Sequence, residues 1–163
     1  MNKVSIIHPL NTWTDNGERS SYVEKEFTIA EDFYNELAVY YRIRNYMGRC
    51  LDNNRTLLFK LPNIIDIRYY SNTIVYEYIG ELILGTPDGN DEVVEVIHEL
   101  KDMAYDLNLV PHEVLFMKKN NNIYILDFEK WIWIKDLDNH IGKWYHSLLE
   151  KWPIKNKEQL WKN

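Results

Sequence analysis

Two short apolar runs, one within Pro111–Met117 and one within Ile123–Glu129, constrain the fold more than any other part of the sequence. The polar residues between them, Lys118–Asn122, have the composition of a tight turn, so the two runs are predicted to form a β-hairpin. The second run is apolar throughout until Asp127, which indicates a strand buried on both faces. A carboxylate at the end of such a rigid strand is well suited to hold a metal ion.

Composition limits the classes of protein to which the chain can belong. Its 163 residues, 45% of them hydrophobic, are enough to bury one core, so one compact domain is expected. A net charge of −6 argues against a basic surface, so nucleic acid is not an expected partner. The single cysteine, Cys50, excludes an internal disulfide and fits a reducing compartment.

The sequence carries no signal for a membrane. No apolar run approaches the roughly 20 residues of a membrane-spanning helix. The apolar stretch within Met1–Pro9 is also too short for a signal peptide. We therefore expect a soluble cytoplasmic protein with no membrane partner. For a viral chain, or one secreted by a microbe, the compartment would be the host cytoplasm.

Four strands are predicted in the first half of the chain. Lys3–Leu10 and Ser21–Phe27 are short strand candidates, and the turn-forming pair Asn16–Gly17 between them indicates a β-hairpin. Further strands are predicted at Asn63–Tyr70 and Thr73–Ile79, where β-branched and aromatic residues are frequent. These strands together predict a small antiparallel sheet.

Three helices are predicted. Thr28–Glu31 is a capping box, and the helix that it begins should end near Gly48. A second helix begins at Asn90 or Asp91, and a third is predicted at Asp136–Trp152. The residues expected on the buried faces of the first two helices are Phe33, Leu37, Tyr40, Ile43, Met47, Val93, Val94, Val96, Ile97, Leu100, Met103, Ala104 and Leu107. A strand-rich first half and a helix-rich second half indicate the α+β class.

Two motifs within this order of elements resemble the protein-kinase-like fold in a minimal, atypical form. Leu126–Glu129 is similar to the strand end of that family that carries Asp-Phe-Gly or Asp-Phe-Glu, and Ile74–Gly80 is similar to its hinge strand. The resemblance covers Val23–Trp133 and implies a truncated two-lobe fold in one domain that spans the whole chain. Residues 1–79 would form a lobe of a small antiparallel sheet plus one helix, and residues 80–163 a reduced helical lobe.

The resemblance also implies that ATP binds between the two lobes. Lys25, in the strand before the first helix, would hold the α- and β-phosphates, and Glu36 in that helix would pair with it. An ammonium beside a triphosphate needs a carboxylate to fix its position, which gives this pairing a physical reason. The backbone N–H and C=O groups of Glu77, Tyr78 and Ile79 would bind the adenine edge.

The same resemblance implies a metal site and a catalytic loop. Asp127 would hold Mg²⁺ against the phosphates, and Glu113 would be the second ligand, where the family has an asparagine. The catalytic triplet of the family falls on Asp106–Asn108. Asn108 would then stand at the position of the catalytic base, and an amide cannot accept the proton. Asp106 would replace it only in a shifted register.

Two further departures bear on activity. Gly17 is the only glycine in the first hairpin, where the family has a glycine-rich loop over the phosphates. Glu129 replaces the glycine that follows Asp-Phe. We therefore expect a minimal kinase-like phosphotransferase that binds Mg-ATP, with weakened or absent catalysis and a protein as its substrate or partner.

Two alternatives stay open. One is a kinase-like protein without catalysis that regulates a protein partner, because large aromatic side chains anchor interfaces. The tryptophans that favour it are Trp131, Trp133, Trp144, Trp152 and Trp161. The other is a small α+β interaction protein that binds no nucleotide.

Overall fold

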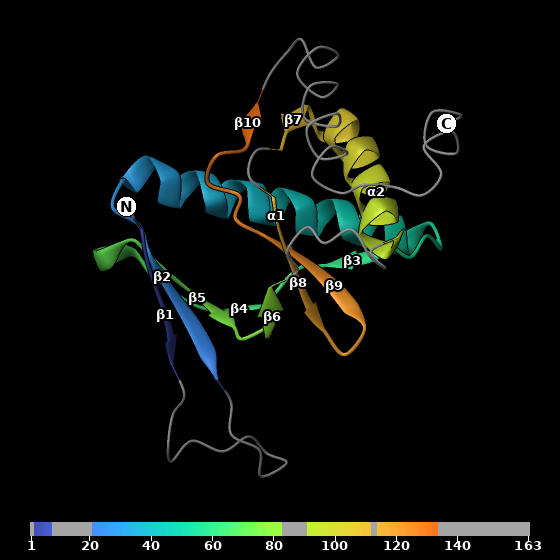
Figure 1. Cartoon of the computed structure of the whole chain (residues 1–163). Coiled ribbons are helices and arrows are strands. Elements are labelled where there is room, and N and C mark those ends of the chain that lie inside the picture. Colours follow the sequence, from blue (N-terminus) through green and yellow to red (C-terminus); the bar gives the residue numbers. More distant parts are fainter. Residues whose placement is uncertain (1, 8–20, 83–90, 112–113, 134–163) are drawn as a thin grey trace.

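The computed structural model describes residues 2–7, 21–82, 91–111 and 114–133 (Figure 1). Within these residues the chain is α+β, as predicted, with two α-helices and three small sheets. Neither of the described helices has the length and apolar character needed to cross a membrane.

The first sheet contains four antiparallel strands in the order β1-β2-β5-β4. Their bounds are Lys3–Ile7 (β1), Tyr22–Glu26 (β2), Ile64–Arg68 (β4) and Thr73–Glu77 (β5). The predicted pairing of the first two strands is confirmed, whereas the turn predicted at Asn16–Gly17 lies outside the described residues. A 3-10 helix at Tyr69–Ser71 and the left-handed Asn72 connect β4 to β5.

Helix α1 (Ala30–Asp52) follows β2, and its predicted start was wrong. The helix begins two residues after Thr28, and its N-cap, Ile29, makes no side-chain capping bond. The N–H of Thr28 instead donates to Oδ1 of Asn2 at 3.1 Å. The predicted N-cap, Thr28, therefore lies one residue before the observed N-cap, and its backbone N–H is bonded to the start of the chain.

The predicted end of α1 near Gly48 was also wrong, since the helix continues for another turn to Asp52. A glycine in an exposed helix position costs only about 1 kcal/mol. The added turn places Cys50 in the core, with 7% of its surface exposed. The helix ends where Asn53 donates to the last carbonyls and Asn54 takes a left-handed φ of 59°.

The second sheet has the order β3-β9-β8-β6. Its strands are Phe59–Lys60 (β3), Glu81–Leu82 (β6), Leu115–Lys119 (β8) and Asn122–Leu126 (β9). The predicted hairpin is confirmed as β8 and β9, which pair antiparallel. Asn120 and Asn121 form its turn with φ of 50° and 66°, values that asparagine tolerates well.

The prediction that β9 is buried on both faces was wrong. Ile123 and Ile125 are buried, while Tyr124 and Leu126, on the opposite face of the strand, are half-buried. The physical reason is a cavity, because Leu126 and the neighbouring Met117 of β8 line it. An apolar strand here faces a cavity on one side and the core on the other.

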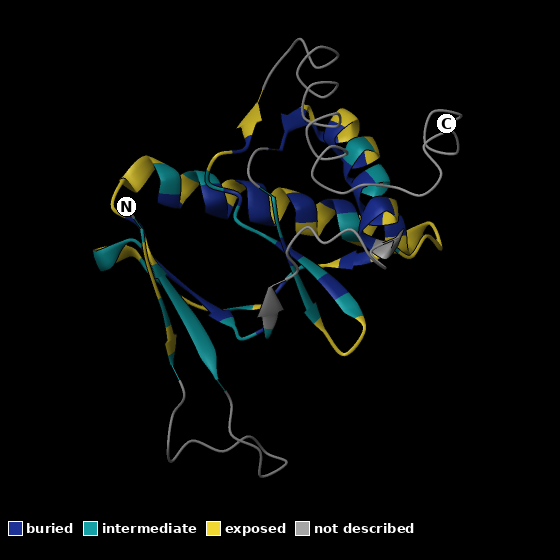
Figure 2. Cartoon of the chain, in the orientation of Figure 1, coloured by how far each residue is buried: buried dark blue, intermediate teal, exposed yellow. Residues whose placement is uncertain are grey.

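Helix α2 (Asp91–Leu107) confirms the second predicted helix, and its predicted apolar face from Val93 onward is buried. In Figure 2, buried residues form dark bands along both α1 and α2. Strand β7 (Leu109–Val110) follows α2 and pairs with β10 (Ile132–Trp133). The third predicted helix, Asp136–Trp152, lies outside the described residues.

Candidate functional site

A cavity of about 470 Å³ lies between the first sheet and the β8–β9 hairpin. Its volume is within the range of small-molecule sites, about 300–1,000 Å³. The apolar residues that line it come from both sheets and from the segment after β5: Val4, Ile6, Val23, Ile79, Leu115, Met117 and Leu126. Because side chains alternate along a strand, Val23 and Lys25 of β2 both face this cavity.

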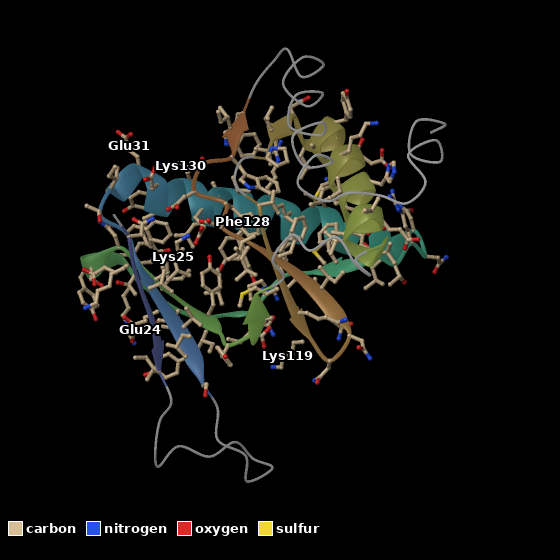
Figure 3. The ribbon with its side chains drawn as sticks, viewed as in Figure 1. Glu24, Lys25, Glu31, Lys119, Phe128 and Lys130 are labelled. Carbon is tan, nitrogen blue, oxygen red and sulfur yellow. The ribbon has the colours of Figure 1, made fainter. Side chains whose placement is uncertain are left out.

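The polar end of the cavity is built around Lys25, which Figure 3 shows below α1. Its Nζ lies 2.9 Å from Oε1 of Glu36 and 2.8 Å from Oδ1 of Asp127. Burial alone would lower the pKa of Lys25, but the two carboxylates outweigh this effect and raise the pKa above its ordinary value. The structure thus brings together three of the residues that the sequence singled out.

Glu36 is almost completely buried, with 1% of its surface exposed. Besides the contact with Lys25, its Oε1 accepts a hydrogen bond from the backbone N–H of Phe128 at 3.0 Å. Its Oε2 accepts a hydrogen bond from the hydroxyl of Tyr76 at 2.7 Å. A buried carboxylate is tolerated when it is paired and hydrogen-bonded in this way. Glu36 therefore ties α1 to the first sheet and to the turn after β9.

Asp127 has a left-handed backbone with φ of 75°. This conformation costs a non-glycine residue of order 1–3 kcal/mol, and aspartate is among the residues that tolerate it best. It turns the chain at the end of β9, so that Phe128 enters the core while Asp127 lines the cavity. The packing of Phe128 and the ion pair with Lys25 hold the turn in place.

A third carboxylate lies beside this pair. Oε2 of Glu129 is 3.8 Å from Nζ of Lys25, and 12% of the Glu129 side chain is exposed. The amide of Asn2 donates a hydrogen bond to the same oxygen. Burial raises the pKa of Glu129, and Asp127 and Glu36 raise it further, while Lys25 acts in the opposite direction.

Because the pKa of Glu129 is raised on folding, the ionised carboxylate disfavours the folded state at neutral pH. At a pH below the pKa of Glu129 in the unfolded state, the protonated carboxyl contributes its full stability to the fold. This contribution is lost as the pH rises through the higher pKa of Glu129 in the folded state. We expect Glu129→Gln to unfold at a higher urea concentration than wild type at pH 7, with a difference that narrows as the pH falls toward 4.5.

Urea denaturation at several pH values checks this prediction. Glu26→Gln is the matched control, because Glu26 is exposed and lies next to Lys25 in β2. A Glu129→Gln protein less stable than wild type at pH 7 would contradict the prediction.

Asn35, the neighbour of Glu36, makes a second connection from α1. Its Nδ2 lies 2.9 Å from the carbonyl oxygens of Glu129 and of Trp131, and 3.4 Å from that of Phe128. These acceptors belong to the turn that follows Asp127. Asn35 and Glu36 together therefore fix both the backbone N–H and the backbone carbonyls of that turn to the helix.

Sequence reasoning missed Asn35, Tyr76 and Asn2. An asparagine in the middle of a helix is unfavourable, and this was the one local signal for Asn35. In the sequence, Tyr76 is indistinguishable from the apolar residues of its strand. No local pattern points to Asn2, because its partners Thr28 and Glu129 are distant in sequence.

Two predicted catalytic residues do not line the cavity. Asp106 lies in the last turn of α2 and Asn108 directly follows that helix with a left-handed φ of 55°, and both are exposed. Only four residues, 111–114, connect β7 to β8, and Glu113, the predicted second metal ligand, lies outside the described residues. The described parts of the chain contain no group of three histidine, cysteine or acidic side chains arranged to hold a metal.

The predicted adenine-binding residues Glu77, Tyr78 and Ile79 do line the cavity. The side chain of Glu77 accepts a hydrogen bond from the backbone N–H of Asn63 at 2.9 Å. The N–H of Tyr78 donates to the carbonyl of Ser21 at 3.3 Å. These bonds attach the segment after β5 to the first sheet and make it a fixed rim of the cavity.

Comparison with known proteins adds no further information. No protein-family model matches the chain, and no curated protein matches it. An apolar cavity with one lysine and several carboxylates at one end can enclose a flat ring and place a polar group beside the charges.

Proposed function

We propose that this protein is a reduced kinase-like protein of two lobes, which binds Mg-ATP in the cavity and transfers phosphate slowly or not at all. The observation that carries the proposal is the position of Lys25. Its ammonium joins Glu36 of α1 to Asp127 at the end of β9, at the polar end of an apolar cavity. An ammonium held by a carboxylate on a helix is the arrangement that positions α- and β-phosphates.

The apolar part of the cavity supports an aromatic ring as the other half of the ligand. Val4, Ile6 and Val23 come from the first sheet, whereas Leu115, Met117 and Leu126 come from the second. A flat base enclosed between them would bury apolar surface on both faces. Each Å² of apolar surface removed from water contributes about 25 cal/mol of favourable free energy. The segment Glu77–Ile79 lies at the rim, and Ile79 would supply the backbone N–H for the edge of the base, because the N–H groups of Glu77 and Tyr78 already donate to Asn63 and Ser21.

The donor set also fits a magnesium ion. Mg²⁺ prefers oxygen ligands and usually takes one or two carboxylates from the protein, while phosphate oxygens and water complete its shell. Asp127 would supply one such carboxylate. When bound, the ion would neutralise phosphate charge, and Lys25 would hold the phosphates in position.

Weak or absent transfer would follow from the lack of a free base among the described residues that line the cavity. Each acidic group within 4 Å of Lys25 is already paired with it, and the remaining acidic residue of the described lining, Glu77, is bonded to Asn63. Positioning and charge neutralisation dominate phosphoryl transfer, so binding would survive the loss of a base while the rate would fall.

A thermal-shift titration tests the proposal. We expect Mg-ATP at a hundred times its Kd to stabilise wild type by about 2.7 kcal/mol. Asp127→Asn should lose most of this stabilisation, because it removes a carboxylate from the metal and from Lys25. Asp66→Asn is the control, since Asp66 lies in β4 with 54% of its side chain exposed. No shift in wild type would refute nucleotide binding and favour the role without nucleotide.

A protein-binding role is the second candidate, and exposed aromatic side chains favour it. Tyr34 and Tyr41 of α1 are 55% and 42% exposed, and Trp133 is 42% exposed beside Arg42. Trp131, in contrast, is buried in the core. A partner that binds wild type but not Trp133→Ala, with the Mg-ATP shift unchanged, would support this role.

A further inference from the structure

The charge at the polar end of the cavity is unusual for a site that receives phosphates. Lys25 is the only cation among the described residues that line the cavity. Three carboxylates lie within 4 Å of its Nζ, at 2.9, 2.8 and 3.8 Å. One ammonium and three carboxylates leave a net charge of −2 when all are ionised. An approaching phosphate would meet repulsion rather than attraction.

We propose that Glu129 makes this cavity selective against anionic ligands, so that a nucleoside binds without metal while a nucleoside triphosphate binds only together with a divalent cation. This inference rests on the proposed function, because it assigns a ligand class to the same cavity. It adds a specificity-determining residue that the nucleotide-binding proposal does not require.

Glu129 is the carboxylate whose charge is least compensated. Glu36 is bonded by Lys25, Tyr76 and a backbone N–H, and Asp127 lies 2.8 Å from the ammonium. Glu129 lies a full ångström farther from Lys25 than Asp127 does, at 3.8 Å. Its charge therefore acts on any anion that enters the polar end.

Glu129 is also held in place. The amide of Asn2 donates to its carboxylate, and the Oδ1 of Asn2 is itself fixed by the N–H of Thr28. The side chain is largely covered, and its backbone carbonyl accepts a hydrogen bond from Asn35. The carboxylate consequently cannot swing into solvent to make way for a phosphate without breaking these contacts.

Calorimetric titration with three probes tests the inference: adenosine, ATP in EDTA, and ATP with excess Mg²⁺. We expect wild type to bind adenosine with the same Kd with and without Mg²⁺, and to bind ATP at least about tenfold more weakly in EDTA than in Mg²⁺. Glu129→Gln should bind ATP in EDTA about tenfold more tightly than wild type, with its adenosine affinity unchanged. Glu26→Gln, which alters an exposed carboxylate of β2, should behave as wild type.

Asn2→Ala provides a second variant that keeps the charge but removes the amide that holds Glu129. It should also improve the binding of ATP in EDTA, by less than Glu129→Gln. If wild type binds ATP equally well in EDTA and in Mg²⁺, or if Glu129→Gln leaves that ratio unchanged, the inference fails while nucleotide binding stands. If neither adenosine nor Mg-ATP binds, the proposed function fails and the inference fails with it.

Discussion

Glu36→Ala is expected to lower the free energy of unfolding by about 3–5 kcal/mol, the usual effect of removing one partner from a buried ion pair. The substitution leaves three groups without their acceptor: the ammonium of Lys25, the hydroxyl of Tyr76 and the N–H of Phe128. Lys25 keeps Asp127 as a partner, but the other two lie in the core, where an unsatisfied donor costs about 1–3 kcal/mol. Urea denaturation at pH 7 measures the loss.

Two milder variants separate the contributions. Glu36→Gln keeps an acceptor oxygen for Lys25 and Phe128 and should cost less than Glu36→Ala. Tyr76→Phe removes only the hydroxyl and should cost about 1 kcal/mol. A Glu36→Ala protein as stable as Tyr76→Phe would show that Glu36 does not connect α1 to the first sheet and to the turn after β9 in solution.

Local sequence signals accounted for most of the described elements. The asparagine-rich turn between β8 and β9 and the apolar face of α2 need no information from elsewhere in the chain, because turn chemistry and helical spacing are local. The ends of α1 were predicted wrongly because distant contacts set them. Asn2 accepts a hydrogen bond from the backbone N–H of Thr28, just before the helix, and the burial of Cys50 favours the last turn.

The site, in contrast to these elements, was predicted only in part and only through a resemblance. Lys25, Glu36 and Asp127 were singled out through a resemblance, since nothing in the spacing of residues 102 positions apart indicates that Lys25 and Asp127 touch. Burial of both faces of β9 was predicted from its apolar residues, and a cavity explains the error. An apolar side chain that faces a cavity and one that faces the core look alike in a sequence.

The residues that hold the site together could not be predicted. Tyr76, Asn2 and Asn35 are polar or aromatic side chains of ordinary types at ordinary positions. Each acquires its role only when the fold brings together residues that are far apart in sequence. Glu36 and Phe128, for example, are separated by 92 positions. The fold thus depends on two neighbouring polar residues of α1, Asn35 and Glu36, which bind opposite sides of one turn.

Asn35→Asp is therefore the second substitution with a large expected effect, a loss of about 3 kcal/mol or more in the free energy of unfolding at pH 7. It replaces the amide that donates to the backbone carbonyls of the turn after Asp127 with a carboxylate of the same size. The new oxygens would face the carbonyls of Glu129 and Trp131, both 2.9 Å from the present Nδ2. Lost hydrogen bonds and repulsion between oxygens would act together.

Asn35→Ala separates these two effects, because it removes the donor without adding a charge and should cost about 1–3 kcal/mol. The carbonyl oxygens would raise the folded pKa of the introduced carboxyl, so the excess cost of Asn35→Asp over Asn35→Ala should be largest at pH 7 and shrink as the pH falls through that pKa. Urea denaturation of both variants at pH 7 and pH 5 measures this excess. Equal stability of the two variants at pH 7 would mean that the turn after Asp127 moves away from α1 without cost, and the rigid polar end that positions Lys25, Asp127 and Glu129 would then not exist.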